Sequence, residues 1–181
     1  MIQANRRVSG SLQPESEADC AGLSDYLHAR SGLISHHEYL IPALLRELGT
    51  LDHAPDRARV FDLGCGNGVV ASILASRGYA VTGVDPSSSG IRLCRSRFPG
   101  LDLHRGSAYD DLRSKYGQFP IVTSLEVVEH VFAPRKYAAT LYELLEPEGT
   151  AIVSTPFHGY WKNVALAVSG RMDDHYLPLW D

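Results

Sequence analysis

Short apolar runs alternate along the chain with stretches whose apolar positions have helical spacing. Each run is bounded by glycine, proline or polar residues, as strands commonly are. The predicted strands are residues 60–63, 80–85, 101–104, 119–125 and 150–155. Strands that alternate with helices predict an α/β fold with a doubly wound, mostly parallel sheet and right-handed crossovers. In such a sheet the ligand site lies at the carboxyl ends of the strands.

The part of the chain before the first strand has two patterns. Residues 1–22 are polar and are predicted to form a loose tail. A helical pattern follows over residues 25–48, with leucines along one face, and Gly49 ends it. Pro42 lies inside this run and is predicted to mark the start of a helix, with residues 35–40 as a separate lead-in.

Composition and charge place the chain among ordinary globular proteins. Its 181 residues are 44% hydrophobic and 21% charged, which suits one domain with a substantial core. A net charge of −4 gives no reason to expect a nucleic acid or an anionic membrane as partner. No stretch approaches the roughly 20 apolar residues of a membrane span, and residues 1–19 lack the pattern of a signal peptide. Three widely spaced cysteines fit neither a disulfide framework nor a zinc site, so we expect a reducing, cytoplasmic location.

The segment from Val60 to Gly68 is the most informative part of the sequence. A short apolar strand is followed by three glycines at alternate positions and then by a helix, which is the first half of a nucleotide-binding βαβ unit. The glycines run G-x-G-x-G, and Val69 stands where a dinucleotide fingerprint has its third glycine. A phosphate-binding P-loop is excluded, because the sequence has no G-x-x-x-x-G-K-[ST].

Two acidic residues at predicted strand ends narrow the choice of ligand. Asp62 stands two residues before the first glycine, where it would repel a pyrophosphate but attract an amino group. Asp85 ends the next strand, about 20 residues after the glycines, where an acid accepts both ribose hydroxyls. A ligand with a ribose, an amino group and no phosphate fits this pair, and S-adenosylmethionine is such a ligand.

The pattern Asp62-x-Gly64-x-Gly66-x-Gly68, followed by Asp85, resembles motif I and the next acidic position of class I S-adenosylmethionine-dependent methyltransferases. The resemblance covers about residues 60–155 and implies a Rossmann-like fold. It also implies that the loop at residues 106–110 holds the adenine, for which a turn without function is the alternative, and that Leu125 lies against the adenosyl group. The cofactor-binding residues expected on this basis are Asp62, Gly64, Cys65, Gly66, Gly68, Asp85, Pro86, Ser107, Ala108, Leu125 and Glu126.

The pattern Glu126-x-x-Glu129-His130 follows the fourth predicted strand and is the candidate for the chemistry. If a helix begins there, the two carboxylates are one turn apart and face one point. Two carboxylates and an imidazole suit Mg²⁺ or Mn²⁺, and such an ion would lower the pKa of a bound phenol. On residue types alone, an interpretation without a metal is equally supported. In it the two carboxylates are solvated and His130 caps the helix.

The stretch from Ser124 to Val131 resembles motif IV of the O-methyltransferases that act on polyprenyl-hydroxyphenols and demethylubiquinones. In that subgroup the E-x-x-E-H triplet is linked to a divalent ion near the acceptor. The resemblance therefore implies metal ligation by Glu126, Glu129 and His130, with Glu129 and His130 as catalytic residues.

The segment after residue 155 departs from the ubiquinone enzymes and resembles a bacterial branch of uncharacterised methyltransferases. It is rich in polar and aromatic groups that would lie over the strand ends. The alternative, which we consider equally, is that the aromatic side chains of this arm only pack and do not contact a substrate. The candidate contacts to the methyl acceptor are His158, Tyr160, Lys162, Asn163, Asp173 and His175.

These patterns divide the chain into a tail (1–22), lid helices (23–50), a cofactor-binding core (58–155) and an arm over the acceptor site (156–181). Members of the family carry two further strands after the fifth, but no strand signal follows residue 155 here. The fifth strand would then be an exposed apolar edge, which proteins normally cover. We expect a truncated form of the fold, or a homodimer or partner chain that covers this edge.

The sequence thus favours an S-adenosylmethionine-dependent methyltransferase that moves a methyl group to a hydroxyl of a small catechol-like or polyprenylphenol-like molecule, with or without a metal. A catalytically weak cofactor-binding module that works with a partner chain is the alternative. An NAD-dependent oxidoreductase is disfavoured by Val69 and Asp62.

Overall fold

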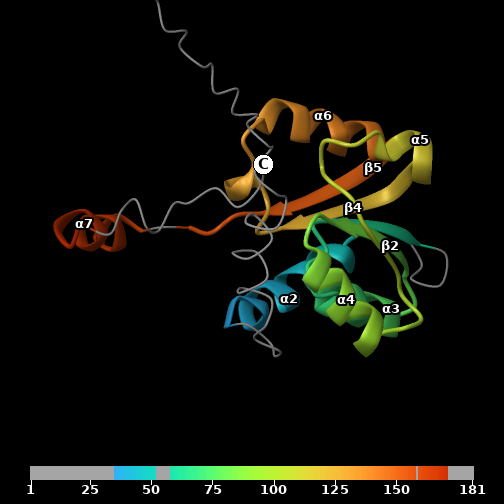
Figure 1. Ribbon diagram of the computed structural model, residues 1–181, viewed down its shortest axis with the longest axis horizontal. Coiled ribbons are helices and arrows are strands. Elements are labelled where there is room, and N and C mark those ends of the chain that lie inside the picture. The colour runs from blue at the N-terminus through green and yellow to red at the C-terminus, as the bar shows by residue number, and fades with distance from the viewer. Residues whose placement is uncertain (1–34, 52–57, 158, 171–181) are drawn as a thin grey trace, which may run out of the picture.

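The computed structural model describes residues 35–51, 58–157 and 159–170 of the chain. Its centre is a sheet of five strands in the order β3-β2-β1-β4-β5, and all neighbouring strands are parallel (Figure 1). The predicted doubly wound α/β fold is therefore confirmed. The strands are β1 (Arg59–Leu63), β2 (Ala80–Asp85), β3 (Asp102–Arg105), β4 (Phe119–Leu125) and β5 (Leu145–Ser154).

Helices cover both faces of the sheet (Figure 1). Because successive side chains of a strand point to opposite faces, neighbouring residues of β1 belong to different cores. Val60 packs in the core that contains Leu44 and Leu74, and Phe61 packs in the core that contains Leu141. No helix in the three described ranges is long and apolar enough to span a membrane. The helices are α2 (Ser35–Leu48), α3 (Val69–Ser76), α4 (Ser88–Arg97), α5 (Leu112–Tyr116), the 3-10 helix η1 (Val128–His130), α6 (Pro134–Leu144) and α7 (Tyr160–Val168).

The first described helix corrects one prediction. Helix α2 runs from Ser35 to Leu48 and contains Pro42, so the prediction that Pro42 starts a helix is wrong. An interior proline removes a backbone hydrogen bond and costs roughly 3 kcal/mol. Leu44 and Leu48 on this helix are buried in the core, and their burial offsets that cost.

The last strand of the sheet corrects a second prediction. Strand β5 begins at Leu145 and not at residue 150, because the chain passes from α6 directly into the strand. The pairing with β4 is irregular at this point: Phe119 pairs with Leu145, and Ile121 pairs with Thr150. Residues 147–149 are therefore an irregular part of the strand.

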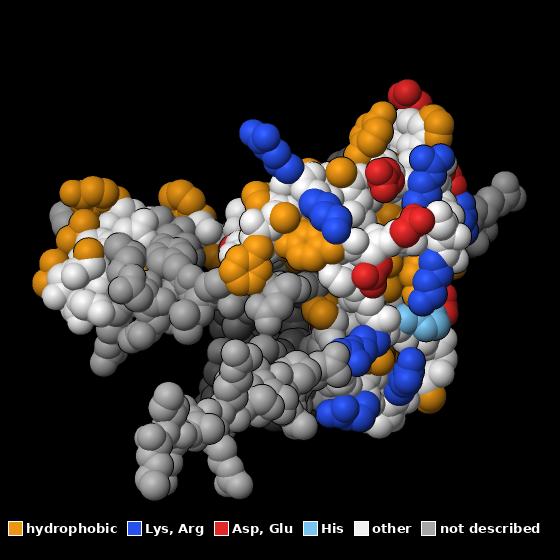
Figure 2. Space-filling model, turned by 45° about the horizontal axis from the view of Figure 1, so that its top comes forward, with side chains coloured by type: hydrophobic (Ala, Val, Ile, Leu, Met, Phe, Trp, Pro, Cys, Tyr) orange, Lys and Arg blue, Asp and Glu red, His pale blue; other side chains and the backbone are white. Residues whose placement is uncertain are grey.

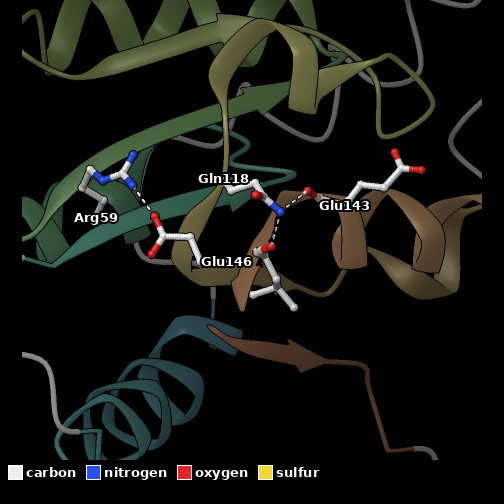
Figure 3. Close-up of polar contacts among 5 residues, drawn as sticks. Arg59, Gln118, Glu143 and Glu146 are labelled. Atoms are coloured by element: carbon white, nitrogen blue, oxygen red, sulfur yellow. Dashed lines mark hydrogen bonds and ion pairs between the residues drawn. The ribbon is translucent and has the colours of Figure 1, made fainter. Parts of the chain in front are cut away.

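Polar contacts hold the start of β5 against the rest of the sheet (Figure 3). Gln118 Nε2 donates to the carbonyl oxygens of Glu143 at 3.3 Å and Leu145 at 2.6 Å. Arg59 of β1 forms an ion pair with Glu146 (Figure 3). These contacts tie β5 to its partners at the amino end of the strand, far from the predicted ligand edge.

Strand β5 is an outer strand of the described sheet, as predicted. Val153 in its carboxyl half is 43% exposed. Beyond β5 the chain continues as an extended segment, and α7 stands clear of the sheet at the far left of Figure 1. Apolar side chains gather on the protruding part of the molecule at the left of Figure 2. Phe157, Tyr160 and Val168 in the chain beyond β5 are exposed.

Candidate functional site

The glycine turn between β1 and α3 is held in a left-handed backbone conformation. Gly64, Gly66 and Gly68 have φ angles of 90°, 53° and 78°. A Cβ on Gly64 would lie 2.3 Å from Cγ2 of Val127, and one on Gly68 would lie 2.6 Å from Sγ of Cys94. Side chains at these two positions would therefore clash with the protein itself, in addition to any strain of the backbone.

Asp85 at the end of β2 supports this turn. Its carboxylate is buried and accepts hydrogen bonds from the backbone N–H of Gly66 at 2.8 Å and of Ser87 at 2.8 Å. Ser87 in turn caps α4, because its hydroxyl accepts a hydrogen bond from the N–H of Gly90 at 3.1 Å. Pro86, between the two, accepts a hydrogen bond at its carbonyl from Arg105 Nε at 3.4 Å.

Asp62 is a buried acid with one unmatched oxygen. It is 2% exposed, and Oδ1 accepts a hydrogen bond from the Thr123 hydroxyl at 3.0 Å. Within the described part of the chain, Oδ2 is buried and has no partner. Burial raises the pKa of Asp62 to about 7; the hydrogen bond from Thr123 lowers it and the nearby Asp85 charge raises it. A positively charged group beside Oδ2 would relieve this cost.

Hydroxyl groups of β4 hold the carboxyl end of β1, and the sequence analysis missed them. Thr123 binds the Asp62 side chain, while the next residue, Ser124, donates from Oγ to the Leu63 carbonyl oxygen at 2.7 Å. The Tyr137 hydroxyl of α6 donates to Ser124 Oγ at 2.7 Å. Both β4 residues are fully buried. The sequence did contain a signal for these contacts, which is a Thr-Ser pair inside an apolar strand. Such a pair predicts hydrogen bonds to neighbouring elements, because buried polar groups need partners.

The turn after β4 begins with a strained residue. Glu126 has a φ of 57°, which is unusual for a residue other than glycine. Its N–H lies 3.2 Å from the Ser154 carbonyl oxygen and 3.1 Å from Ser154 Oγ. The Ser154 hydroxyl donates to Glu126 Oε1 at 2.8 Å. The end of β5 thus fixes both the backbone and the carboxylate of Glu126.

Glu129 and His130 lie on η1, and His130 Nε2 is 3.9 Å from Glu129 Oε1. Burial raises the pKa of the Glu129 carboxyl, with a further raising effect of Glu126 and lowering effects of backbone and Thr155 hydrogen bonds. Burial lowers the pKa of His130, and the Glu126 charge opposes that shift. The imidazole is therefore neutral near pH 7 and able to accept a proton.

The predicted metal-ligand set is not assembled in the described part of the chain. The expectation that Glu126 and Glu129 lie one turn apart on a helix is wrong, because Glu126 precedes a three-residue 3-10 helix. Among the residues that the structure describes, no group of three or more His, Cys, Asp or Glu side chains is arranged to hold a metal ion. The role of Glu126, Glu129 and His130 as metal ligands therefore has no support from the described residues.

Hydrogen bonds from side chains within the loop stabilise the predicted adenine loop at residues 106–110. The Ser107 N–H donates to Asp110 Oδ2 at 2.8 Å, and the Tyr109 N–H donates to Ser107 Oγ at 3.2 Å. Ala108 is buried in the core under α5 and α6. The Tyr109 hydroxyl accepts a hydrogen bond from the Ala133 N–H at 3.1 Å, which joins this loop to the segment that precedes α6.

The three predicted acceptor contacts that the structure describes are not brought to the glycine turn. Tyr160, Lys162 and Asn163 lie on α7, which stands clear of the sheet (Figure 1), and Tyr160 is 74% exposed. His158, Asp173 and His175 lie outside the described residues. The role of all six residues stays a prediction.

Comparison with known proteins gives the family of the chain. Residues 33–179 match the family described as methyltransferase domain. The ubiquinone biosynthesis O-methyltransferase of Aromatoleum aromaticum is 35% identical over 101 residues, which is 54% of this chain and 43% of that protein. The enzyme of the same name from Ruegeria pomeroyi is 33% identical over 128 residues, which is 69% of this chain and 51% of that protein. The chain thus spans about half the length of the curated relatives it matches.

Solved structures of methyltransferases share the fold. PKMT2 from Rickettsia typhi in complex with AdoHcy is 29% identical with a TM-score of 0.52, over 58% of this chain and 22% of that one. SAM-bound CalS10, an amino pentose methyltransferase from Micromonospora echinaspora, is 25% identical with a TM-score of 0.54, over 75% of this chain and 56% of that one. The resemblance predicted from the glycine turn and the motif around Glu126 is confirmed, and the chain belongs to the methyltransferase domain family.

Proposed function

We propose that this protein is an S-adenosylmethionine-dependent methyltransferase that methylates a hydroxyl of a small catechol-like or polyprenylphenol-like molecule. The observation that carries the proposal is the buried Oδ2 of Asp62 at the end of β1, which has no hydrogen-bond partner among the described residues. A carboxylate in that position calls for a cation, and the amino group of the cofactor is one.

The other residues of this edge fit the same ligand. Asp85 ends β2 and binds the turn through Gly66 and Ser87, and an acid at this place in a nucleotide-binding fold accepts ribose hydroxyls. Glycine has no Cβ, so the backbone of this turn allows a ligand to approach it closely. When bound, the cofactor supplies an activated methyl group, so the protein mainly orients donor and acceptor.

His130 is the proposed general base. Its neutral imidazole accepts the phenol proton, and Glu129 at 3.9 Å stabilises the resulting imidazolium. Assistance by Mg²⁺ or Mn²⁺ has no support from the donor set, so we assign no step to a metal. The names of the curated relatives support an oxygen acceptor, because they are O-methyltransferases of ubiquinone biosynthesis.

A catalytically weak cofactor-binding module that acts with a partner is the second candidate. It is favoured by the position of α7, because this helix, which carries Tyr160, Lys162 and Asn163, stands clear of the sheet (Figure 1). A second copy or a partner chain on the edge of β5 belongs to the same proposal. A reducing, cytoplasmic setting suits the free thiols of Cys65 and Cys94.

Calorimetry with S-adenosylhomocysteine, followed by turnover on a panel of catechols and phenols, tests the proposal. Binding with turnover supports the enzyme, and binding without turnover on any acceptor supports the module. No binding at cofactor concentrations up to the millimolar range would contradict both.

A further inference from the structure

A chain of buried hydroxyl groups runs from α6 through β4 to β1. The Tyr137 hydroxyl donates to Ser124 Oγ at 2.7 Å, and Ser124 Oγ donates to the Leu63 carbonyl oxygen at 2.7 Å. Tyr137 and Ser124 are both buried. Each hydroxyl has one proton, so the direction of donation is set by the final acceptor, which is a carbonyl oxygen. Linked hydrogen bonds of this kind strengthen one another.

Two members of this hydroxyl chain, Leu63 and Ser124, adjoin turns of the candidate cofactor site. Leu63 is followed by Gly64, where the backbone enters the glycine turn at a φ of 90°. Ser124 is followed by Leu125 and then by Glu126, whose φ is 57°. The register between β1 and β4 runs from Val60 to Asp62, so Leu63 lies just beyond the paired residues. The hydroxyl chain therefore bridges β1 and β4 where the two strands lead into their turns.

We propose that Tyr137 is a positioning residue for the cofactor site. Acting through Ser124, its hydroxyl holds the carboxyl ends of β1 and β4 at the separation that the bound cofactor requires, and this inference rests on the proposed function. We assign Tyr137 no contact with the cofactor, because its side chain is buried in the core that contains Phe61 and Leu141. Burial raises the pKa of Tyr137, so its hydroxyl stays protonated and can donate a hydrogen bond.

If Tyr137 only packed in the core, its aromatic ring would be sufficient and its hydroxyl would not be needed. Tyr137 shares its core with Phe61, Leu141 and Leu144, and a phenylalanine would fill the same space. The hydroxyl therefore separates the two roles. Removal of the hydroxyl leaves the packing in place and breaks the link to Ser124.

The test compares three single variants by calorimetric affinity for S-adenosylhomocysteine and by unfolding temperature. We expect Tyr137→Phe to raise the Kd roughly three- to tenfold, the scale of one lost neutral hydrogen bond. Tyr142→Phe removes a hydroxyl from the same helix at a side chain that is 79% exposed, and it should leave the Kd unchanged. Leu141→Ala destabilises the same core without a hydroxyl, and it should lower the unfolding temperature with little change in Kd.

A double-mutant cycle supplies the second reading. Ser124→Ala should weaken binding by itself, and Tyr137→Phe added to Ser124→Ala should cost nothing further, because the link is already broken. Wild-type binding together with an unchanged Kd in Tyr137→Phe, or fully additive effects in the double variant, would overturn the positioning role alone. Absence of binding by the wild-type protein would overturn the proposed function and this inference together.

Discussion

The carboxylate of Asp85 accepts a hydrogen bond from the backbone N–H of Gly66 at 2.8 Å, across a separation of 19 residues. This bond joins the end of β2 to the middle of the glycine turn. The other carboxylate oxygen accepts the N–H of Ser87 at the start of α4. Asp85 therefore holds both the turn that leads into α3 and the turn that leads into α4.

Replacement of Asp85 by alanine should weaken S-adenosylhomocysteine binding by about 1.5–3 kcal/mol, the scale of hydrogen bonds to a charged group. The loss combines the missing ribose acceptor with a loosened glycine turn. Calorimetry measures it, with Asp102→Ala, an exposed acid on neighbouring β3, as control. Equal affinities in Asp85→Ala and wild type would refute the assignment of this acid to the cofactor.

The raised pKa of Asp62 predicts a pH-dependent stability. In the unfolded state the pKa of Asp62 has its ordinary value of 3.8, whereas in the folded state it is about 7. The free energy of unfolding should therefore fall by at most about 4 kcal/mol as pH rises between these two values. Above the higher value it should stay level.

Asp62→Asn should remove this fall, because asparagine resembles the protonated acid. Urea denaturation of both proteins at pH 5 and pH 8 measures the difference. Saturating S-adenosylhomocysteine should also flatten the wild-type profile, since its amino group favours the ionised acid. Parallel profiles for wild type and Asp62→Asn would show that Asp62 does not titrate in this range.

The left-handed backbone of Glu126 predicts that glycine is better tolerated there than alanine. Both substitutions lose the hydrogen bond from Ser154, so their difference isolates the backbone strain. Glu126→Gly should be more stable than Glu126→Ala by about 1 kcal/mol. Urea denaturation measures this, and a more stable alanine variant would mean that position 126 is not strained.

His130 as general base predicts a specific pH profile. Burial lowers its pKa from 6.5, so the rate on a phenolic acceptor should rise with pH in the acidic range and be level at neutral pH. His130→Gln should lower the rate by roughly 10²–10⁴-fold with unchanged affinity for S-adenosylhomocysteine. EDTA should have no effect on the wild type. A rate that falls in EDTA and returns with Mg²⁺ or Mn²⁺ would restore the metal hypothesis.

The outer position of β5 predicts self-association or partner binding at this edge. If a second copy covers it, the apparent mass by light scattering should rise with concentration, and Val153→Lys should suppress that rise. Val153→Ala is the matched control without a charge. A wild-type protein that stays monomeric over the whole dilution series would exclude the homodimer.

The sequence determined the features that depend on neighbouring residues. The apolar run of β4 set its bounds at Phe119–Leu125, and the alternate glycines set a left-handed turn after β1. Hydrophobic period and glycine spacing are local signals, so they survive without knowledge of the fold. The order of strands and acids along the chain was enough to place the candidate ligand edge.

Only the tertiary structure decided how distant residues meet at that edge. The bond between Thr123 and Asp62 spans 61 residues, and no local pattern encodes such a contact. The same holds for the hydroxyl chain from Tyr137 to Leu63 and for the strained φ of Glu126, which the end of β5 holds in place. Pro42 inside α2 and the early start of β5 follow the same rule, because long-range packing and pairing overrode a local break signal.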